Sequence, residues 1–204
     1  SPPSAPSAEY KYVKTEADHL QVAMGFPSYG ASHKDRSALT MLSAVLGTGT
    51  SSRLFQSVRE RKALVYSVYT TVSQESDASS LAAYMSCTDK NVEEAMSTTV
   101  SEIGKLLADG LEKGELDRAK NLVKGANVRA MESTEHRLYR LCVNNLLNGS
   151  TESLEERLAK IDAVTDDDVM RVAEDVLRPD RLNVVVLGKA GRPVRNKDIS
   201  DLGF

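Results

Sequence analysis

Arg59 and Tyr66 are the two side chains whose types and spacing best fit chemistry on a peptide group. They stand seven positions apart, at the end of an expected short helix and near the start of the following expected strand. Arginine offers a planar fork of donors that keeps its charge, and tyrosine offers a neutral O–H donor on a rigid stem. Such a pair could hold a peptide carbonyl or stabilise the oxyanion formed when water attacks it. A structural interpretation stays open, because Arg59 can complement the helix dipole and Tyr66 can close the edge of a core.

Metal binding has little support in the sequence. The three histidines are His19, His33 and His136, none has another histidine three to five positions away, and no cysteine lies close by. The patterns H-E-x-x-H and H-x-x-E-H are both absent. We therefore expect this chain to hold no metal and no other cofactor.

Two further kinds of site are disfavoured. The run Gly47-Thr48-Gly49 follows an expected helix, whereas a dinucleotide-binding loop follows a strand and carries a third glycine. No G-K-[ST] sequence and no G-x-S-x-G nucleophile elbow is present. The glycines are better explained as a flexible connection between two helices.

Composition excludes several classes of protein. The 204 residues are 27% charged and 41% hydrophobic, as in an ordinary globular domain, and the formal net charge is −3. With no basic run of five residues we expect no nucleic-acid partner, and with no long apolar stretch we expect no membrane span. Cys87 and Cys142 are expected to be buried small hydrophobes rather than a disulfide, which is compatible with a reducing, cytoplasmic compartment.

The chain is expected to contain one domain with two flanking segments. Its first eight residues are rich in proline and serine, so residues 1–17 are assigned to a linker. Residues 18–190 form the expected domain, and residues 191–204 form a C-terminal tail.

The first half of this domain is expected to mix strands and helices. Residues 19–26 alternate apolar and polar side chains up to Pro27, which predicts a strand that ends at the proline. A helix should follow over residues 32–46, and a shorter one from about residue 52 to residue 61.

Residues 64–74 are the most strand-like segment, because they are dense in β-branched and aromatic side chains. A turn at residues 76–77 and a returning strand over residues 81–87 would complete an antiparallel hairpin. Strict alternation divides the first strand into two faces, with Leu64, Tyr66, Val68, Thr70 and Val72 on one and Val65, Ser67, Tyr69 and Thr71 on the other.

The second half is expected to be helical, with a short final strand over residues 182–187. Capping boxes are expected at Ser153 with Glu156 and at Thr165 with Asp168. The helix capped by Ser133 or Thr134 is expected to turn Leu138, Leu141, Cys142 and Leu146 inward. Strands that bracket a run of helices predict an α+β fold, with a single mostly antiparallel sheet and helices packed on one face.

One segment resembles a known family. Residues 46–69, L-G-T-G-T-S-S-R-L-F-Q-S-V-R-E-R-K-A-L-V-Y-S-V-Y, look like the signature of the second, non-catalytic domain of insulinase/pitrilysin-type zinc peptidases. That pattern is a glycine-rich break, then S-S-R-L-F, then R-E-x-x-G-L-x-Y, which places the family's arginine and tyrosine on Arg59 and Tyr66. The segment G-E-L-D-R-A-K at residues 114–120 resembles a recurrent helix start of the same family. Ala63 departs from the pattern, which has glycine there; if the position needs positive φ, alanine costs about 1 kcal/mol.

The resemblance implies a role in proteolysis in which this chain is not an enzyme by itself. Arg59 and Tyr66 would hold the backbone of a peptide or unfolded-protein substrate, while zinc and its general base would lie in a catalytic domain of the same or a partner chain. The parent protein would be a dimeric zinc-dependent endopeptidase. Two alternatives stay open: a structural or partner subunit with the same fold, and an unrelated α+β ligand-binding domain.

Overall fold

A single five-stranded sheet organises the molecule, whose computed structural model describes residues 8–73, 79–149 and 151–189. The strand order is β1-β5-β2-β4-β3, in which only β1 and β5 run parallel to each other. The strands are β1 (Glu9–Lys14), β2 (Leu20–Ser28), β3 (Val65–Val72), β4 (Ser79–Cys87) and β5 (Asn183–Gly188). The expected turn at residues 76–77, the tail at residues 191–204 and most of the Pro/Ser-rich N-terminus lie outside the described residues.

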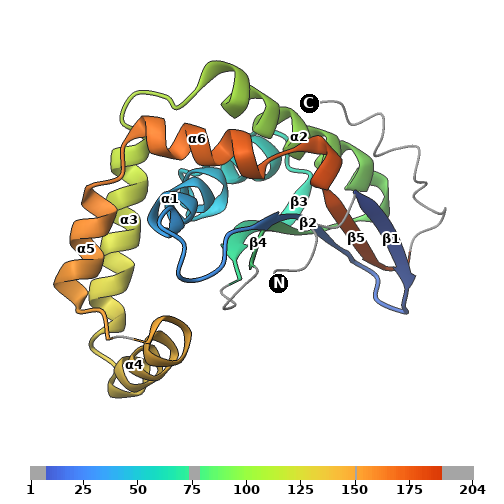
Figure 1. Cartoon of the computed structure of the whole chain (residues 1–204). Coiled ribbons are helices and arrows are strands. Elements are labelled where there is room, and N and C mark those ends of the chain that lie inside the picture. Colours follow the sequence, from blue (N-terminus) through green and yellow to red (C-terminus); the bar gives the residue numbers. More distant parts are fainter. Residues whose placement is uncertain (1–7, 74–78, 150, 190–204) are drawn as a thin grey trace.

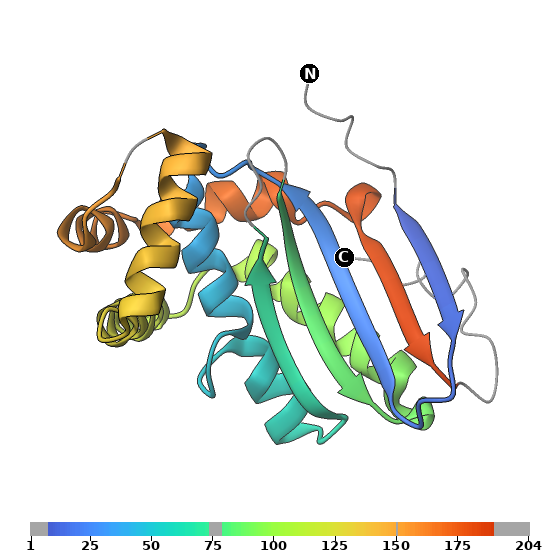
Figure 2. The same cartoon turned by 90° about the horizontal axis from the view of Figure 1, so that it is seen from below.

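Helices cover one face of this sheet and leave the other uncovered (Figures 1 and 2). In Figure 2 the sheet is seen from its uncovered face, with α2 and α6 behind it and α1 beside β3. The helices are α1 (Arg36–Gly47), the π-helical η1 (Phe55–Arg61), the 3-10 turn η2 (Asp89–Asn91), α2 (Val92–Asp109), α3 (Glu115–Ala130), α4 (Thr134–Asn148), α5 (Leu154–Asp162), α6 (Asp166–Val176) and the 3-10 turn η3 (Pro179–Arg181). The predicted α+β architecture is confirmed.

Local sequence signals account for several helix ends. Both expected capping boxes are present: the Glu156 N–H donates to Ser153 Oγ over 3.1 Å, and the Asp168 N–H donates to Thr165 Oγ1 over 3.1 Å. Each reciprocal bond is also made, so two otherwise unpaired N–H groups are satisfied at the start of α5 and of α6. Ser133 caps α4 by accepting the His136 N–H.

The N-terminal part of the sheet differs from expectation. Residues 9–14, which the sequence assigns to a linker, form strand β1 and pair in parallel with β5. The proline-rich composition ends before them, and the alternating burial of this short edge strand gives only a weak pattern. Strand β2 also continues through Pro27 to Ser28. Proline is tolerated there because β5 pairs with β2 only as far as Gly25, so a single neighbouring strand remains.

Close contact between α1 and β3 fixes one edge of the sheet. Thr70 Oγ1 donates to the Ser43 carbonyl over 2.6 Å, and a Cβ added at Gly47 would lie 2.7 Å from the Thr70 nitrogen. Gly47 is therefore a packing residue that lets the end of α1 reach the backbone of β3. The glycine run 47–49 does connect α1 with η1, but its first member is held against the strand.

Helix α4 lies beyond α3 and α5, away from the sheet (Figure 1). The prediction that its apolar stripe turns inward is wrong: Leu138 is 63% exposed, Leu146 is 82% exposed and Cys142 is exposed too. Asn144 is the one buried side chain among those described in this helix. Cys87 behaves as expected of a core residue, and burial raises the pKa of its thiol to about 11.

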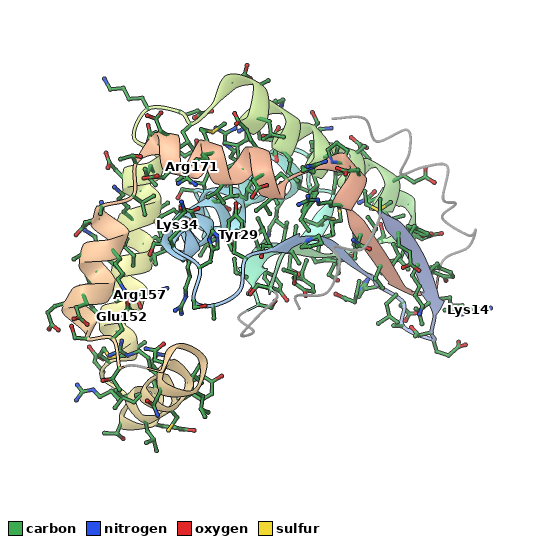
Figure 3. All side chains as sticks on the ribbon, viewed as in Figure 1. Lys14, Tyr29, Lys34, Glu152, Arg157 and Arg171 are labelled. Carbon is green, nitrogen blue, oxygen red and sulfur yellow. The ribbon has the colours of Figure 1, made fainter. Side chains whose placement is uncertain are left out.

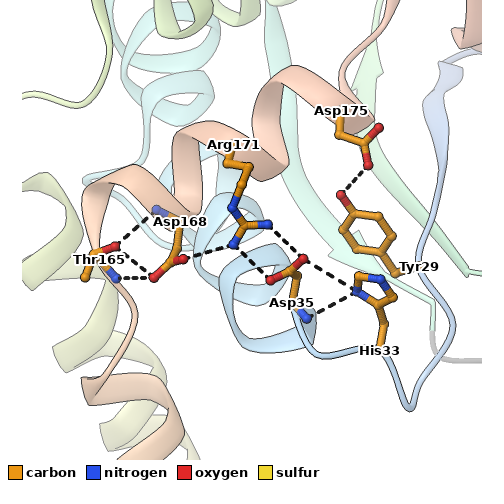
Figure 4. Close-up of polar contacts among 7 residues, drawn as sticks. All are labelled: Tyr29, His33, Asp35, Thr165, Asp168, Arg171 and Asp175. Carbon is orange, nitrogen blue, oxygen red and sulfur yellow. Dashed lines mark hydrogen bonds and ion pairs between the residues drawn. The ribbon is translucent and has the colours of Figure 1, made fainter.

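A polar network joins α6 to the connection between β2 and α1 (Figures 3 and 4). The Arg171 guanidinium donates two hydrogen bonds to Asp35, of 2.8 and 2.9 Å, and a third to Asp168. Asp35 is the N-cap residue of α1 but makes no capping bond with its side chain, because Arg171 engages both carboxylate oxygens. Nearby, the Tyr29 hydroxyl donates to Asp175 over 2.5 Å, and the Tyr29 ring stacks on His33.

This network predicts a loss of stability in acid. Hydrogen bonds from Thr165 hold the pKa of Asp168 at about 2, and the hydrogen bonds from Arg171 lower the pKa of Asp35. In the folded protein the pKa of each aspartate lies below the ordinary aspartate pKa near 4. The stabilisation from these contacts is therefore present above about pH 4 and is lost as the pH falls through the folded-state pKa of each carboxylate. We expect the free energy of unfolding, measured by urea denaturation from about pH 5 to about pH 2, to fall less steeply in Arg171→Met than in the wild type. Equal slopes for the two proteins would contradict this assignment.

Candidate functional site

A tight reversal leads from helix η1 into strand β3. Its pivot is Ala63, with φ of +50°, the one described non-glycine residue in the left-handed region. The Ala63 N–H donates to the Arg59 carbonyl and the Leu64 N–H donates to the Val58 carbonyl, which closes the helix end. Asn91 Nδ2 donates to the Leu64 carbonyl over 3.0 Å and fixes the point where the strand begins. The suspected requirement for positive φ at position 63 is confirmed.

A β-bulge follows at once and sets the direction of Tyr66. Val65 pairs with Cys87 and Ser67 pairs with Ser86, so Tyr66 is an extra residue on β3. Strict alternation places Tyr66 on the face of Val68 and Thr70, which are buried, and this prediction is wrong. The bulge turns Tyr66 to the uncovered face, where its side chain is 57% exposed.

Tyr66 lies at the end of the sheet where β2 and β3 begin and β4 ends. Its ring centroid is 4.7 Å from that of His19, at an interplanar angle of 60°. Its hydroxyl has no hydrogen-bond partner among residues 8–73, 79–149 and 151–189. Tyr69 and Tyr84 stack on each other further along the same uncovered face, with ring centroids 5.4 Å apart. Tyr66 thus presents a free O–H donor at one end of an aromatic surface.

Arg59 stands on the exposed side of η1, in its last turn. Its guanidinium lies 4.8 Å from the centroid of the Phe55 ring, one helical turn earlier. This cation–π contact orients the group without using its N–H donors. In the part of the chain that the structure describes, no carboxylate pairs with Arg59. Its charge and its donors therefore remain available for a ligand.

The start of the segment that carries Arg59 is anchored by a buried ion pair. Arg53 donates to the two Glu115 oxygens, both at 2.7 Å, and also to the Gly110 carbonyl. The Arg53 and Glu115 side chains are only 10% and 8% exposed. Hydrogen bonding to Glu115 raises the pKa of Arg53. Because removing one partner of such a pair costs about 3–5 kcal/mol, this contact holds η1 firmly against the start of α3.

The site contains no arrangement suited to zinc. Among the described residues, no group of three or more His, Cys, Asp or Glu side chains could hold a metal ion. Two of the three histidines make ring contacts instead: His19 contacts Tyr66, and His33 stacks on Tyr29. Likewise, no helix in the described ranges is long and apolar enough to cross a membrane.

The structure assembles the predicted pair only in part. Arg59 and Tyr66 lie on the two sides of the Ala63 reversal, both exposed, and make no hydrogen bond or ring contact with each other in the described structure. Two neighbours had not been assigned to the site. Phe55 is recognisable as the i−4 partner of Arg59 on a helix. His19 is not, because its approach to Tyr66 depends on the pairing of β2, β4 and β3.

Comparison with a family profile adds independent information. Residues 1–123 match the family described as Peptidase M16 inactive domain. Among curated proteins, an uncharacterized zinc protease of Streptomyces coelicolor is 35% identical over 93% of this chain and 40% of its own length. Uncharacterized zinc proteases of Mycobacterium tuberculosis and Bacillus subtilis are each 34% identical, over 88% and 82% of this chain. The chain spans about two fifths of the length of these relatives.

Solved structures agree on the fold. A peptidase M16 inactive domain from Pseudomonas fluorescens superimposes with a TM-score of 0.82 at 20% identity, over 95% of this chain and 47% of that one. A protease from Helicobacter pylori gives 0.81 at 24% identity, over 91% and 45%. A chain of complex III2 from Candida albicans gives 0.85 at 19% identity, over 97% and 50%.

The conformation of Ala63 predicts the effect of a glycine. Ala63→Gly should raise the free energy of unfolding by about 0.5–1 kcal/mol, because relief of the left-handed strain exceeds the entropy that glycine adds to the unfolded chain. Ala126→Gly, at an exposed position inside α3, is the matched control and should lower it by about 1 kcal/mol. Urea denaturation of both variants measures these changes. A loss of stability in Ala63→Gly would show that the alanine is not strained.

Proposed function

The chain belongs to the peptidase M16 family, as its inactive domain, and we propose that it serves a zinc endopeptidase by holding the substrate backbone with Arg59 and Tyr66. The main support for this proposal is that both side chains are exposed and lie on either side of one reversal. Within the described structure neither side chain makes a hydrogen bond or an ion pair. The domain itself is a non-catalytic, peptidase-like domain.

The chemistry of the pair suits a peptide carbonyl that gains negative charge. Tyr66 offers a neutral O–H on a rigid stem, and Arg59 offers up to five N–H donors with a permanent charge. In the proposed role, both donors approach the oxygen of the peptide group under attack or the carbonyl next to it. Such donors accelerate the reaction to the extent that they bind the oxyanion more strongly than the ground-state carbonyl.

In this proposal the zinc site and the catalytic groups belong to another part of the parent protein. The described residues offer no zinc site, while the relatives are named zinc proteases and are more than twice as long as this chain. We propose that a catalytic domain of the same or a partner chain, in a dimeric protein, faces the Tyr66 end of the uncovered sheet face. Zinc in that domain supplies polarisation of the scissile carbonyl and activation of water. The substrate class is a peptide or an unfolded protein.

A second candidate is a structural subunit without peptidase activity. The observation that favours it is the TM-score of 0.85 with a chain of complex III2 from Candida albicans. At 19% identity that likeness concerns the fold. The two candidate functions differ in the role of Tyr66. A substrate-binding domain requires its exposed hydroxyl as a hydrogen-bond donor, whereas a structural subunit does not.

Removing the Tyr66 hydroxyl tests the proposed role. Tyr66→Phe in the full-length enzyme should lower kcat/KM for a peptide substrate by about 10²–10³-fold, the usual effect of losing one oxyanion donor. Zinc content should stay unchanged, because Tyr66 lies outside the metal-binding part.

Tyr69→Phe is the matched control. Tyr69 lies on the same strand and the same face, is 51% exposed, and should tolerate loss of its hydroxyl with little change in kcat/KM. If Tyr66→Phe cleaves as fast as the wild type, the proposed role of Tyr66 is wrong. If the wild-type protein binds zinc and peptides but cleaves none, the structural alternative is favoured.

A further inference from the structure

Two neighbouring cavities lie between α1, α4 and α5, away from the candidate substrate site. Their volumes are about 350 and 190 Å³, and Arg36, Glu152 and Arg157 line both. Lys34 and Lys160 add positive charge to the larger cavity, and Arg140 adds it to the smaller one. Figure 3 shows Glu152 and Arg157 together at the α5 end that faces α4.

Positive charge is in clear excess around these cavities. Glu152 is the one carboxylate among the described residues that line them. Glu152 already forms an ion pair with Lys160, with 2.7 Å between Lys160 Nζ and Glu152 Oε1, and Arg157 Nη1 lies 3.9 Å from Glu152 Oε2. The segment from Leu147 to Thr151 contains no acidic residue that could add a second carboxylate.

The three arginines around these cavities are partly buried, whereas Lys34 and Lys160 are exposed. The side chain of Arg157 is 12% exposed and that of Glu152 is 14% exposed. Burial, followed by the charge of Arg36, lowers the pKa of Arg157. Arg140 Nε is buried and has no hydrogen-bond partner among the described residues. Gathering like charges in partly buried positions is unfavourable unless a counter-charge occupies the space between them.

We propose that the space between Arg36, Arg140 and Arg157 is a binding site for a phosphate-class oxyanion. A dianion suits the site better than a carboxylate, because the described lining of the two cavities carries five lysine and arginine side chains and one carboxylate. Guanidinium groups also match the tetrahedral oxygens of phosphate through paired N–H···O bonds. The larger cavity leaves room for a phosphomonoester as well as free phosphate. This inference does not depend on the proposed role of Arg59 and Tyr66.

Calorimetric titration with inorganic phosphate, at constant ionic strength, tests the site in the full-length protein. We expect one saturable site whose affinity shifts in opposite directions in two variants. Arg140→Met should weaken phosphate binding by about tenfold, the size of one lost charge-assisted hydrogen bond. Glu152→Gln should tighten it by several-fold, because the competing carboxylate charge is removed.

Arg178→Met is the matched control, since Arg178 is exposed, pairs with Asp180 and lines neither cavity. It should bind phosphate as the wild type does. A parallel titration with phenyl phosphate separates the two sources: tighter binding than phosphate indicates a phosphomonoester, and weaker binding indicates the free anion. Absence of saturable binding of either compound would overturn the proposal. So would an affinity that responds in the same direction to Arg140→Met and Glu152→Gln, because a general effect on folding would produce that result.

Discussion

The left-handed conformation of Ala63 is the constraint on which the candidate site depends. Ala63, at φ of +50°, is the middle one of the three residues between the end of η1 and the start of β3, and the bulge at Tyr66 follows before regular pairing is established. Each device alone is a modest local irregularity. Together they place Arg59 at the end of a helix and turn Tyr66 out of the core, so two exposed donors stand on either side of one reversal. Backbone strain of this kind persists only where surrounding contacts impose it.

Contacts on both sides of the reversal impose the left-handed conformation on Ala63. Arg53 and Glu115 form a buried pair of bidentate geometry that fixes the start of the helical segment. Gly47 lets α1 press on the β3 backbone at Thr70, and Asn91 holds the Leu64 carbonyl. The segments S-S-R-L-F and G-E-L-D-R-A-K, which carry much of the resemblance to zinc peptidases, therefore meet through Arg53 and Glu115.

Structural features that depend on residues close together in the sequence were predictable from it. Features that depend on contacts with distant residues were not. The capping boxes at Ser153 and Thr165 each lie within four residues and are present as predicted. Strand β1 becomes a strand only because β5, about 170 positions away, pairs with it. The bulge at Tyr66 could not be predicted from the alternation of inward- and outward-facing side chains along a strand, because that pattern assumes unbroken pairing with the neighbouring strand. The apolar stripe of α4 has a regular helical period, but periodicity cannot say whether another element covers it. The cationic cavities are lined by residues from α1, α3, α4 and α5, which are far apart in sequence.

The central claim is that substrate lies against Tyr66, and cross-linking from that position tests it most directly. A photoreactive benzophenone side chain would replace Tyr66 in the full-length protein, with zinc chelated so that bound peptide is not cleaved. The control carries the same group at Leu138 on α4, where the native side chain is similarly exposed, at 63% against 57%. The account predicts peptide cross-links from position 66 and few from position 138. Equal labelling at both positions, or labelling at position 138 alone, would contradict it.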